Sequence, residues 1–255
     1  MTYAGVELGG TKCVVILARD ADEVVAREVI PTTSPEETLA RIEQVLLEWR
    51  GSHRLDALGI ASAHLVGVSM GGGIAQDIAV QHPDRVRSLT LIATTAAFDR
   101  VATLPLPPPE PRLAATFEPD ASADVDWEDV DASVAKMVDV QRLYSGARWF
   151  DEDRVRAVAR IVVGRTRNLR ASVTNHWIVI GGGDELPHSM AEIDVPTLVL
   201  HGTEDPLFPF PHGEALASEI QGATLLPLEG MGHEVPPHGL WDVVVPAIVQ
   251  HTALP

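Results

Sequence analysis

The stretch His64-Leu65-Val66-Gly67-Val68-Ser69-Met70-Gly71-Gly72 decides the fold class of this chain. A short apolar run, which we expect to be a β-strand, leads into Gly-x-Ser-x-Gly, and a helical pattern follows from Ile74 to Val80. A strand that turns directly into a helix around a serine exposes the hydroxyl group at the tip of a tight turn. Because the turn is tight, we expect that Gly67 and Gly71, two residues before and after Ser69, must be small. Ser69 is therefore a candidate nucleophile.

Two later segments carry the groups that a serine nucleophile needs. The first is a buried-strand pattern that ends in His201-Gly202-Thr203-Glu204-Asp205-Pro206, and the second is the glycine-flanked histidine of Glu229-Gly230-Met231-Gly232-His233-Glu234. An aspartate in such a position accepts a hydrogen bond from the histidine, fixes its tautomer and stabilises the imidazolium. Side chains alternate near the end of a strand, so we expect Asp205 and not Glu204 to take this role. The order Ser69, Asp205, His233 is typical of α/β-hydrolases.

From about residue 55 to residue 255 the chain resembles α/β-hydrolases, in particular the branch that includes aclacinomycin methylesterases. The resemblance implies an α/β fold with a mostly parallel sheet flanked by helices, formed by residues 63–103 and 186–255. It also implies that the backbone N–H of Met70 is one donor of an oxyanion hole, and that no cofactor or metal is needed. The implied partner is a small-molecule carboxylic ester, with a methyl ester on an aromatic, polyketide-like compound as the finer expectation.

A change of composition separates the two parts of that core. The proline-rich run 104–111 is a stiff connector, and helical patterns follow at 134–145 and 151–163. In α/β-hydrolases an insertion at this place is a cap that shapes the substrate pocket. We therefore expect residues 104–185 to form a helical cap, with Gly181-Gly182-Gly183 leading back to the core.

The first sixty residues follow a different pattern. Val6 to Leu17 contains strand, Gly-Gly turn and strand, a third strand is expected from Glu23 to Ile30, and a helix from the capping box at Ser34 to about Trp49. Residues 1–62 resemble the start of ROK-family sugar kinases of the fructokinase type, an actin-like kinase fold. The resemblance makes Gly9, Gly10, Thr11 and Lys12 a weak candidate phosphate loop, because backbone amides and a lysine can hold phosphate.

The rest of that kinase pattern is missing, including its catalytic aspartate motif and a zinc site that needs several cysteines, whereas Cys13 is the only cysteine. A fusion with its junction near residues 54–62 would explain both resemblances. The hydrolase core would then be truncated, without the strands and the oxyanion loop that precede the serine in this family. Three interpretations stay open: an esterase impaired by this loss, a non-catalytic or inactive chimeric protein, and a remnant of a sugar kinase.

Composition narrows the partners and the location. The formal net charge is −17 at pH 7, which argues against nucleic acid and anionic membranes as partners. No apolar run approaches the ~20 residues of a membrane span, and the N-terminus lacks the pattern of a signal peptide. We therefore expect a cytoplasmic protein, and the oligomeric state stays open. Of the other histidines, we expect a structural role for His201 and surface or turn positions for His82, His212, His238 and His251.

Overall fold

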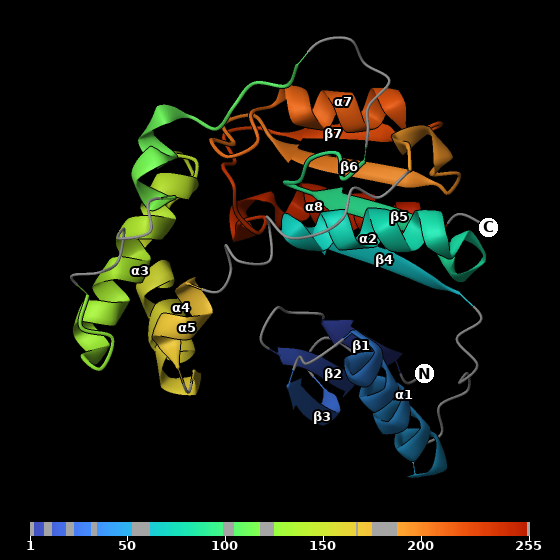
Figure 1. The fold of residues 1–255 in the computed structure, drawn as a ribbon, viewed down its shortest axis with the longest axis horizontal. Coiled ribbons are helices and arrows are strands. Elements are labelled where there is room, and N and C mark those ends of the chain that lie inside the picture. Colours follow the sequence, from blue (N-terminus) through green and yellow to red (C-terminus); the bar gives the residue numbers. More distant parts are fainter. Residues whose placement is uncertain are drawn as a thin grey trace. The chain divides into compact units, whose positions relative to one another are not determined.

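The computed structural model describes residues 3–7, 12–18, 23–31, 35–52, 62–98, 105–117, 125–166, 168–174 and 188–253. The chain divides into two compact units, Met1–Ala61 and Ser62–Pro255. Figure 1 labels their helices and strands.

The first unit contains a three-stranded antiparallel sheet and one helix. Strands β1 (Tyr3–Glu7), β2 (Lys12–Ala18) and β3 (Val24–Pro31) pair in that order, and helix α1 (Pro35–Ser52) follows. One face of α1 packs on the sheet, and the residues buried between them are Cys13, Val15, Ile30, Ile42, Val45 and Leu46. The expected hairpin, third strand and helix are confirmed. The proposed phosphate loop at Gly9, Gly10 and Thr11 lies outside the described residues, and of Lys12 only the backbone is described, as the first residue of β2.

The second unit is built on a parallel sheet of four strands in the order β4-β5-β6-β7. These strands are β4 (Ala63–Val68), β5 (Val86–Ile92), β6 (Thr197–Gly202) and β7 (Thr224–Leu228). Helices α2 (Met70–Gln81) and α7 (Pro211–Glu219) share one apolar cluster with the sheet, and helix α8 (Trp241–Thr252) packs in a second cluster. The sheet is therefore covered by helices on both faces, as Figure 1 shows.

Burial explains the character of the central strands. All six residues of β6 and six of the seven in β5 are buried. Strands of a parallel sheet that is covered by helices on both faces are buried along most of their length. Helix α2 ends at Gln81, with His82 as its C-cap, because Pro83, which begins a short 3₁₀ turn (Pro83–Arg85), cannot continue it. The α/β class with a mainly parallel sheet is confirmed.

The described parts of the chain between β5 and β6 contain helices joined by irregular segments. These parts contain a 3₁₀ turn (Pro111–Thr116) and helices α3 (Val130–Tyr144), α4 (Glu152–Arg165) and α5 (Leu169–Thr174), followed by a 3₁₀ turn at Met190–Glu192. Asp129 and Asp151 cap α3 and α4 by accepting hydrogen bonds from backbone N–H groups. The two helices pack against each other through Val134, Val138 and Ala159. The glycine run 181–183 lies outside the described residues.

Two of the histidine expectations are wrong. His212 and His251 are buried, at 8% exposure each, and both bind backbone carbonyl groups. His212 donates from Nε2 to Pro107 O, and His251 donates from Nε2 to Leu89 O. His82 and His238 are exposed, as expected. Among the described helices, none is long and apolar enough to cross a membrane.

Candidate active site

Ser69 sits at the turn between β4 and α2 with a strained backbone. Its φ is 51° and its ψ −121°, a left-handed conformation that is uncommon for a residue other than glycine. A Cβ atom at Gly67 would collide with the backbone of Gly71 and Gly72, so the expectation for Gly67 is confirmed. The expectation for Gly71 is wrong, because a Cβ atom there would meet nothing within 4 Å. The second tight position is Gly72, where a Cβ atom would lie 2.6 Å from the side chain of Thr94.

Thr94 supports this turn from the end of β5. It is 2% exposed, and its hydroxyl group donates a hydrogen bond to the Ser69 carbonyl oxygen at 2.8 Å. The N–H of Ser69 donates to Ile92 O at 2.9 Å. Both backbone polar groups of Ser69 are therefore bound to the neighbouring segment, and this holds the strained residue in place.

Asp205 follows the carboxyl end of β6. Its side chain is fully buried, while Glu204 beside it is exposed. One carboxylate oxygen, Oδ1, accepts hydrogen bonds from the N–H groups of Leu207 and Phe208 at 2.9 and 2.8 Å. The other oxygen, Oδ2, lies 2.9 Å from Nδ1 of His233. These bonds fix the orientation of the carboxylate, with one oxygen held toward His233.

His233 connects the aspartate to the serine. Its Nε2 lies 2.8 Å from Oγ of Ser69, opposite to the 2.9 Å bond with Asp205. A carboxylate can only accept, so Nδ1 carries a proton, and in the neutral form of the ring Nε2 presents a lone pair. In this tautomer Nε2 accepts a hydrogen bond from the Ser69 hydroxyl group. The arrangement can take a proton from the serine while the carboxylate stabilises the resulting imidazolium.

Two aromatic rings flank the imidazole. The ring of Phe208 lies edge-on to His233 with centroids 5.4 Å apart, and the ring of Tyr144 lies at 6.1 Å. Only 11% of the His233 side chain is exposed. A site with little water strengthens the interactions between its charges and dipoles.

His201 lies in the interior beside this group. Its Nε2 donates to Phe208 O at 2.7 Å, and Nδ1 has no hydrogen-bond partner within the described part of the chain. Burial lowers the pKa of His201, an effect only partly offset by the bond to Phe208 and the nearby Asp205 charge. His201 therefore stays neutral and packs as a structural residue, as its position near the strand suggested.

Met70 is the first residue of α2, and its N–H has no acceptor within the helix. Such a free N–H at a helix start is suited to an oxyanion, because the helix dipole adds to the effect of the N–H. The segment just before β4, residues 53–61, lies outside the described residues. Among the described residues, the backbone N–H of Met70 is thus the candidate hydrogen-bond donor of an oxyanion hole.

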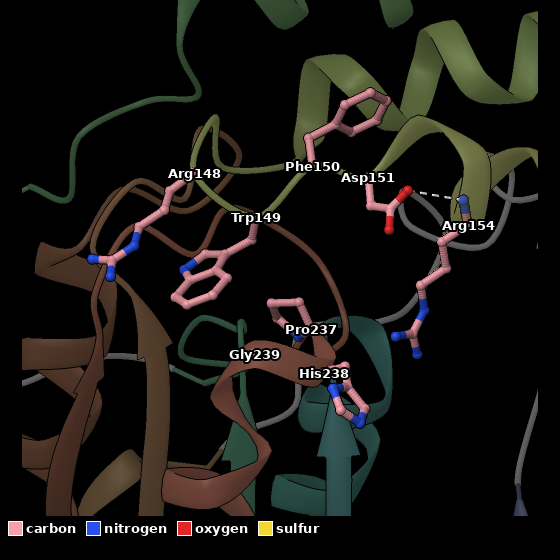
Figure 2. A pocket seen from close by; sticks show the side chains of 8 residues that line it. All are labelled: Arg148, Trp149, Phe150, Asp151, Arg154, Pro237, His238 and Gly239. Atoms are coloured by element: carbon pink, nitrogen blue, oxygen red, sulfur yellow. Dashed lines mark hydrogen bonds between the residues drawn. The ribbon is translucent and has the colours of Figure 1, made fainter.

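A cavity of about 260 Å³ lies to the side of these residues. Figure 2 shows its lining, which comes from the segment Arg148–Asp151 with Arg154 and from Pro237–Gly239. Neither Ser69, Asp205 nor His233 lines it. The cavity marks where the helical segment meets the loop after His233, and it is separate from the serine.

Sequence reasoning missed three contributors to this site: Thr94, Tyr144 and Glu234. Glu234 accepts hydrogen bonds from the N–H groups of Gly146 and Gly232. Its only signal in the sequence is its place directly after the histidine. Thr94 and Tyr144 are far from Ser69 and His233 in sequence, so no spacing pattern points to them.

Comparison with known proteins defines the class of protein to which this chain belongs. Residues 44–237 match the family described as the α/β hydrolase fold. The chain belongs to this family. The family match and the parallel sheet agree with the fold that the sequence indicated from about residue 55.

Individual relatives are enzymes that act on small molecules. A rhodomycin D methylesterase from Streptomyces sp. strain C5 is 30% identical over 215 residues, and the match covers 78% of this chain and 69% of that protein. A 2-hydroxymuconate semialdehyde hydrolase from Pseudomonas putida is 29% identical over 185 residues, with 70% of this chain and 58% of that protein covered.

A solved structure shows the same fold. The 2-hydroxy-6-oxo-6-phenylhexa-2,4-dienoate hydrolase from a Rhodococcus strain superimposes with a TM-score of 0.60 at 16% identity, and the alignment covers 100% of both chains. The family match begins at residue 44, inside the segment 1–62. The proposed kinase-like beginning and the fusion therefore gain no support from these comparisons.

Proposed function

We propose that this protein is a serine hydrolase of carboxylic esters in which Ser69, His233 and Asp205 form the catalytic triad. The observation that carries the proposal is the unbroken line of hydrogen bonds from Ser69 Oγ to His233 Nε2 at 2.8 Å and from His233 Nδ1 to Asp205 Oδ2 at 2.9 Å. Distances in this range are those expected between a nucleophile, its base and the group that orients the base.

The proposed reaction has two stages. Ser69 Oγ attacks the ester carbonyl carbon, its proton passes to His233 Nε2, and the N–H of Met70 donates to the carbonyl oxygen as negative charge develops. His233 then gives the proton to the leaving alcohol, which leaves an acyl group on Ser69. Water attacks that acyl group with His233 as base, and the acid and free serine are released. Asp205 keeps its charge throughout and stabilises the imidazolium.

The substrate we propose is a methyl ester of an aromatic, polyketide-like compound. This follows from the rhodomycin D methylesterase relative, whose match covers 78% of this chain. We infer that residues 104–185 form the cap over that substrate. Helices α3 and α4, which lie within these residues, support the inference of a helical cap.

We also infer that the core is truncated before the serine, because in the described residues the parallel sheet starts with β4, the strand that leads into Ser69. Loss of one oxyanion donor lowers kcat by about 10²–10³-fold. An inactive protein with an intact triad is therefore the competing interpretation. Labelling of the purified protein with a fluorophosphonate probe distinguishes the two.

We expect Ser69 to be labelled, and labelling to disappear in Ser69→Ala. Ser218→Ala is the matched control, because Ser218 lies in α7 and, among the described residues, its hydroxyl group donates to the backbone carbonyl of Ala215. This control should label like the unmodified protein. A folded protein, with a cooperative melting transition, that takes up no probe would overturn the proposal.

A further inference from the structure

The loop that carries His233 is joined to the end of helix α3. The N–H of His233 donates a hydrogen bond of 2.7 Å to the carbonyl oxygen of Tyr144, the last residue of α3. The last carbonyl groups of a helix have no partners within it and need hydrogen-bond donors from outside the helix. The N–H of His233 therefore satisfies a free carbonyl group at the end of α3, a helix in the segment between β5 and β6.

Glu234 joins the same two segments a second time. Its Oε1 accepts a hydrogen bond from Gly146 N at 3.0 Å and another from Gly232 N at 3.2 Å. Gly146 lies just beyond α3, and Gly232 directly precedes His233. Hydrogen bonds to a carboxylate are stronger than those between neutral groups. One oxygen atom therefore binds residues 86 positions apart in sequence (232 − 146) on either side of the contact.

The two segments meet backbone to backbone. A Cβ atom at Gly232 would collide with backbone atoms of Tyr144, Ser145 and Gly146. A Cβ atom at Gly146 would collide with the carbonyl oxygen of Gly230. Because no side chain separates the segments, a shift of one displaces the other.

Trp149 fixes the same contact at its far end. Its Nε1 donates to Glu229 O at 2.8 Å, and the residue packs against the apolar cluster that includes Met231, Leu240 and Val244. Figure 2 shows the indole lying between Arg148 and the turn at Pro237–Gly239. The glutamate and the tryptophan together bracket the stretch Glu229–Glu234.

We propose that Glu234 is a positioning residue that couples the seating of helix α3 to the orientation of the His233 imidazole. This inference rests on the proposed function, because it assigns His233 as the base. The carboxylate fixes Gly232 and Gly146 relative to each other, so the ring of His233 stays between Ser69 and Asp205. Glu234 itself does not contact Ser69 or Asp205 among its described hydrogen bonds.

The test compares Glu234→Ala and Glu234→Gln with Glu229→Ala. Glu229 is a glutamate of the same loop with an exposed side chain, and its backbone bond to Trp149 survives the change. Two readouts are followed in each variant. One is the rate of fluorophosphonate labelling, and the other is the downfield NMR signal of the His233 Nδ1 proton, assigned by its loss in His233→Ala.

For Glu234→Ala we expect labelling slowed by about 10²-fold, since small misplacements of reacting groups have effects of this size. The Nδ1 signal should shift or broaden, and KM for an ester substrate should change much less than kcat. Glu234→Gln keeps an oxygen acceptor, so it should recover most of the rate. Glu229→Ala should match the unmodified protein in both readouts.

An unchanged labelling rate and Nδ1 signal in Glu234→Ala would overturn the inference. So would a labelling rate that falls only in proportion to the unfolded fraction. If Glu234→Ala does not fold, Glu234→Gln decides: a folded variant with full rate and unchanged KM supports an acceptor role, and a slow variant with an unaltered Nδ1 signal contradicts it. Failure of the proposed function looks different, because the unmodified protein would then show the Nδ1 signal without any labelling.

Discussion

The hydroxyl group of Thr94 donates a hydrogen bond of 2.8 Å to the carbonyl oxygen of Ser69, and so ties the end of β5 to the strained turn before α2. Thr94→Val keeps the shape and removes this bond. We expect the free energy of unfolding to fall by about 1 kcal/mol, the usual net value of one hydrogen bond. Denaturant unfolding measures it.

Thr90→Val is the matched control for that experiment. Thr90 lies on the same strand and is fully buried, and within the described residues its hydroxyl group has no hydrogen-bond partner. Removing an unpaired buried hydroxyl should leave the protein as stable or make it more stable. Equal losses for the two variants would show that the Thr94 bond contributes nothing specific.

The glycines on either side of Ser69 should respond differently to alanine. Gly67→Ala places a methyl group into the backbone of Gly71 and should destabilise by about 2 kcal/mol or more. Gly71→Ala meets open space, and alanine favours a helix over glycine by up to about 1 kcal/mol. We therefore expect a lower Tm for the first variant and an unchanged or higher Tm for the second. A loss of the same size in both would mean that the turn itself demands glycine at 71.

Asp205→Asn should abolish most activity without loss of fold. The amide nitrogen of an asparagine would donate toward His233 Nδ1, so the ring proton would move to Nε2, where Ser69 needs an acceptor. In another enzyme with such a triad this substitution lowers kcat by about 10⁴-fold. Initial rates of ester hydrolysis measure the effect. Glu204→Gln, at the exposed neighbouring position, should keep the full rate, and a similar loss there would contradict the assignment.

His201 should make the protein less stable in weak acid. The unfolded chain takes up a proton near the usual histidine pKa of about 6.5, whereas burial holds the folded pKa lower. Protons then favour the unfolded state, so stability is lost as the pH falls below about 6.5 toward the folded pKa. We expect His201→Gln, which keeps a donor for Phe208 O, to show a smaller drop in Tm between pH 7 and pH 5.

The exposed His82 provides the comparison for that pH effect. His82→Gln should retain the pH dependence of the unmodified protein. The same loss of Tm in acid for His201→Gln and the unmodified protein would assign the effect to other groups.

Elements with a strong periodicity or a fixed motif could be predicted from the local sequence. The turn at Ser69, the strand β6 and the helix α1 could be predicted, because their patterns depend on residues close together in the chain. In the structure Glu204 is exposed, whereas Asp205 accepts a hydrogen bond from His233. The role of Asp205 as the acid of a catalytic triad stays a prediction.

What could not be predicted depends on which segments meet in space. His212 and His251 were expected at the surface or in turns, but they are buried, and their Nε2–H groups donate hydrogen bonds to the carbonyl groups of Pro107 and Leu89 in distant segments. Gly72 is the tight glycine in place of Gly71, since Thr94 comes from the next strand. The same holds for Glu234, whose acceptor role needs Gly146 from the end of α3.

The contact between α3 and the histidine loop also limits how this protein could be re-engineered or diversified. Exchanging the helical insertion with that of a relative, to change substrate preference, would remove Tyr144, Gly146 and Trp149 from beneath the loop. A graft that ends at residue 152 would therefore replace the residues that hold the loop of His233 with those of the relative. A transplant that carries residues 229–239 along with the insertion keeps both sides of this contact. We therefore expect these two stretches to be exchanged together in natural recombination.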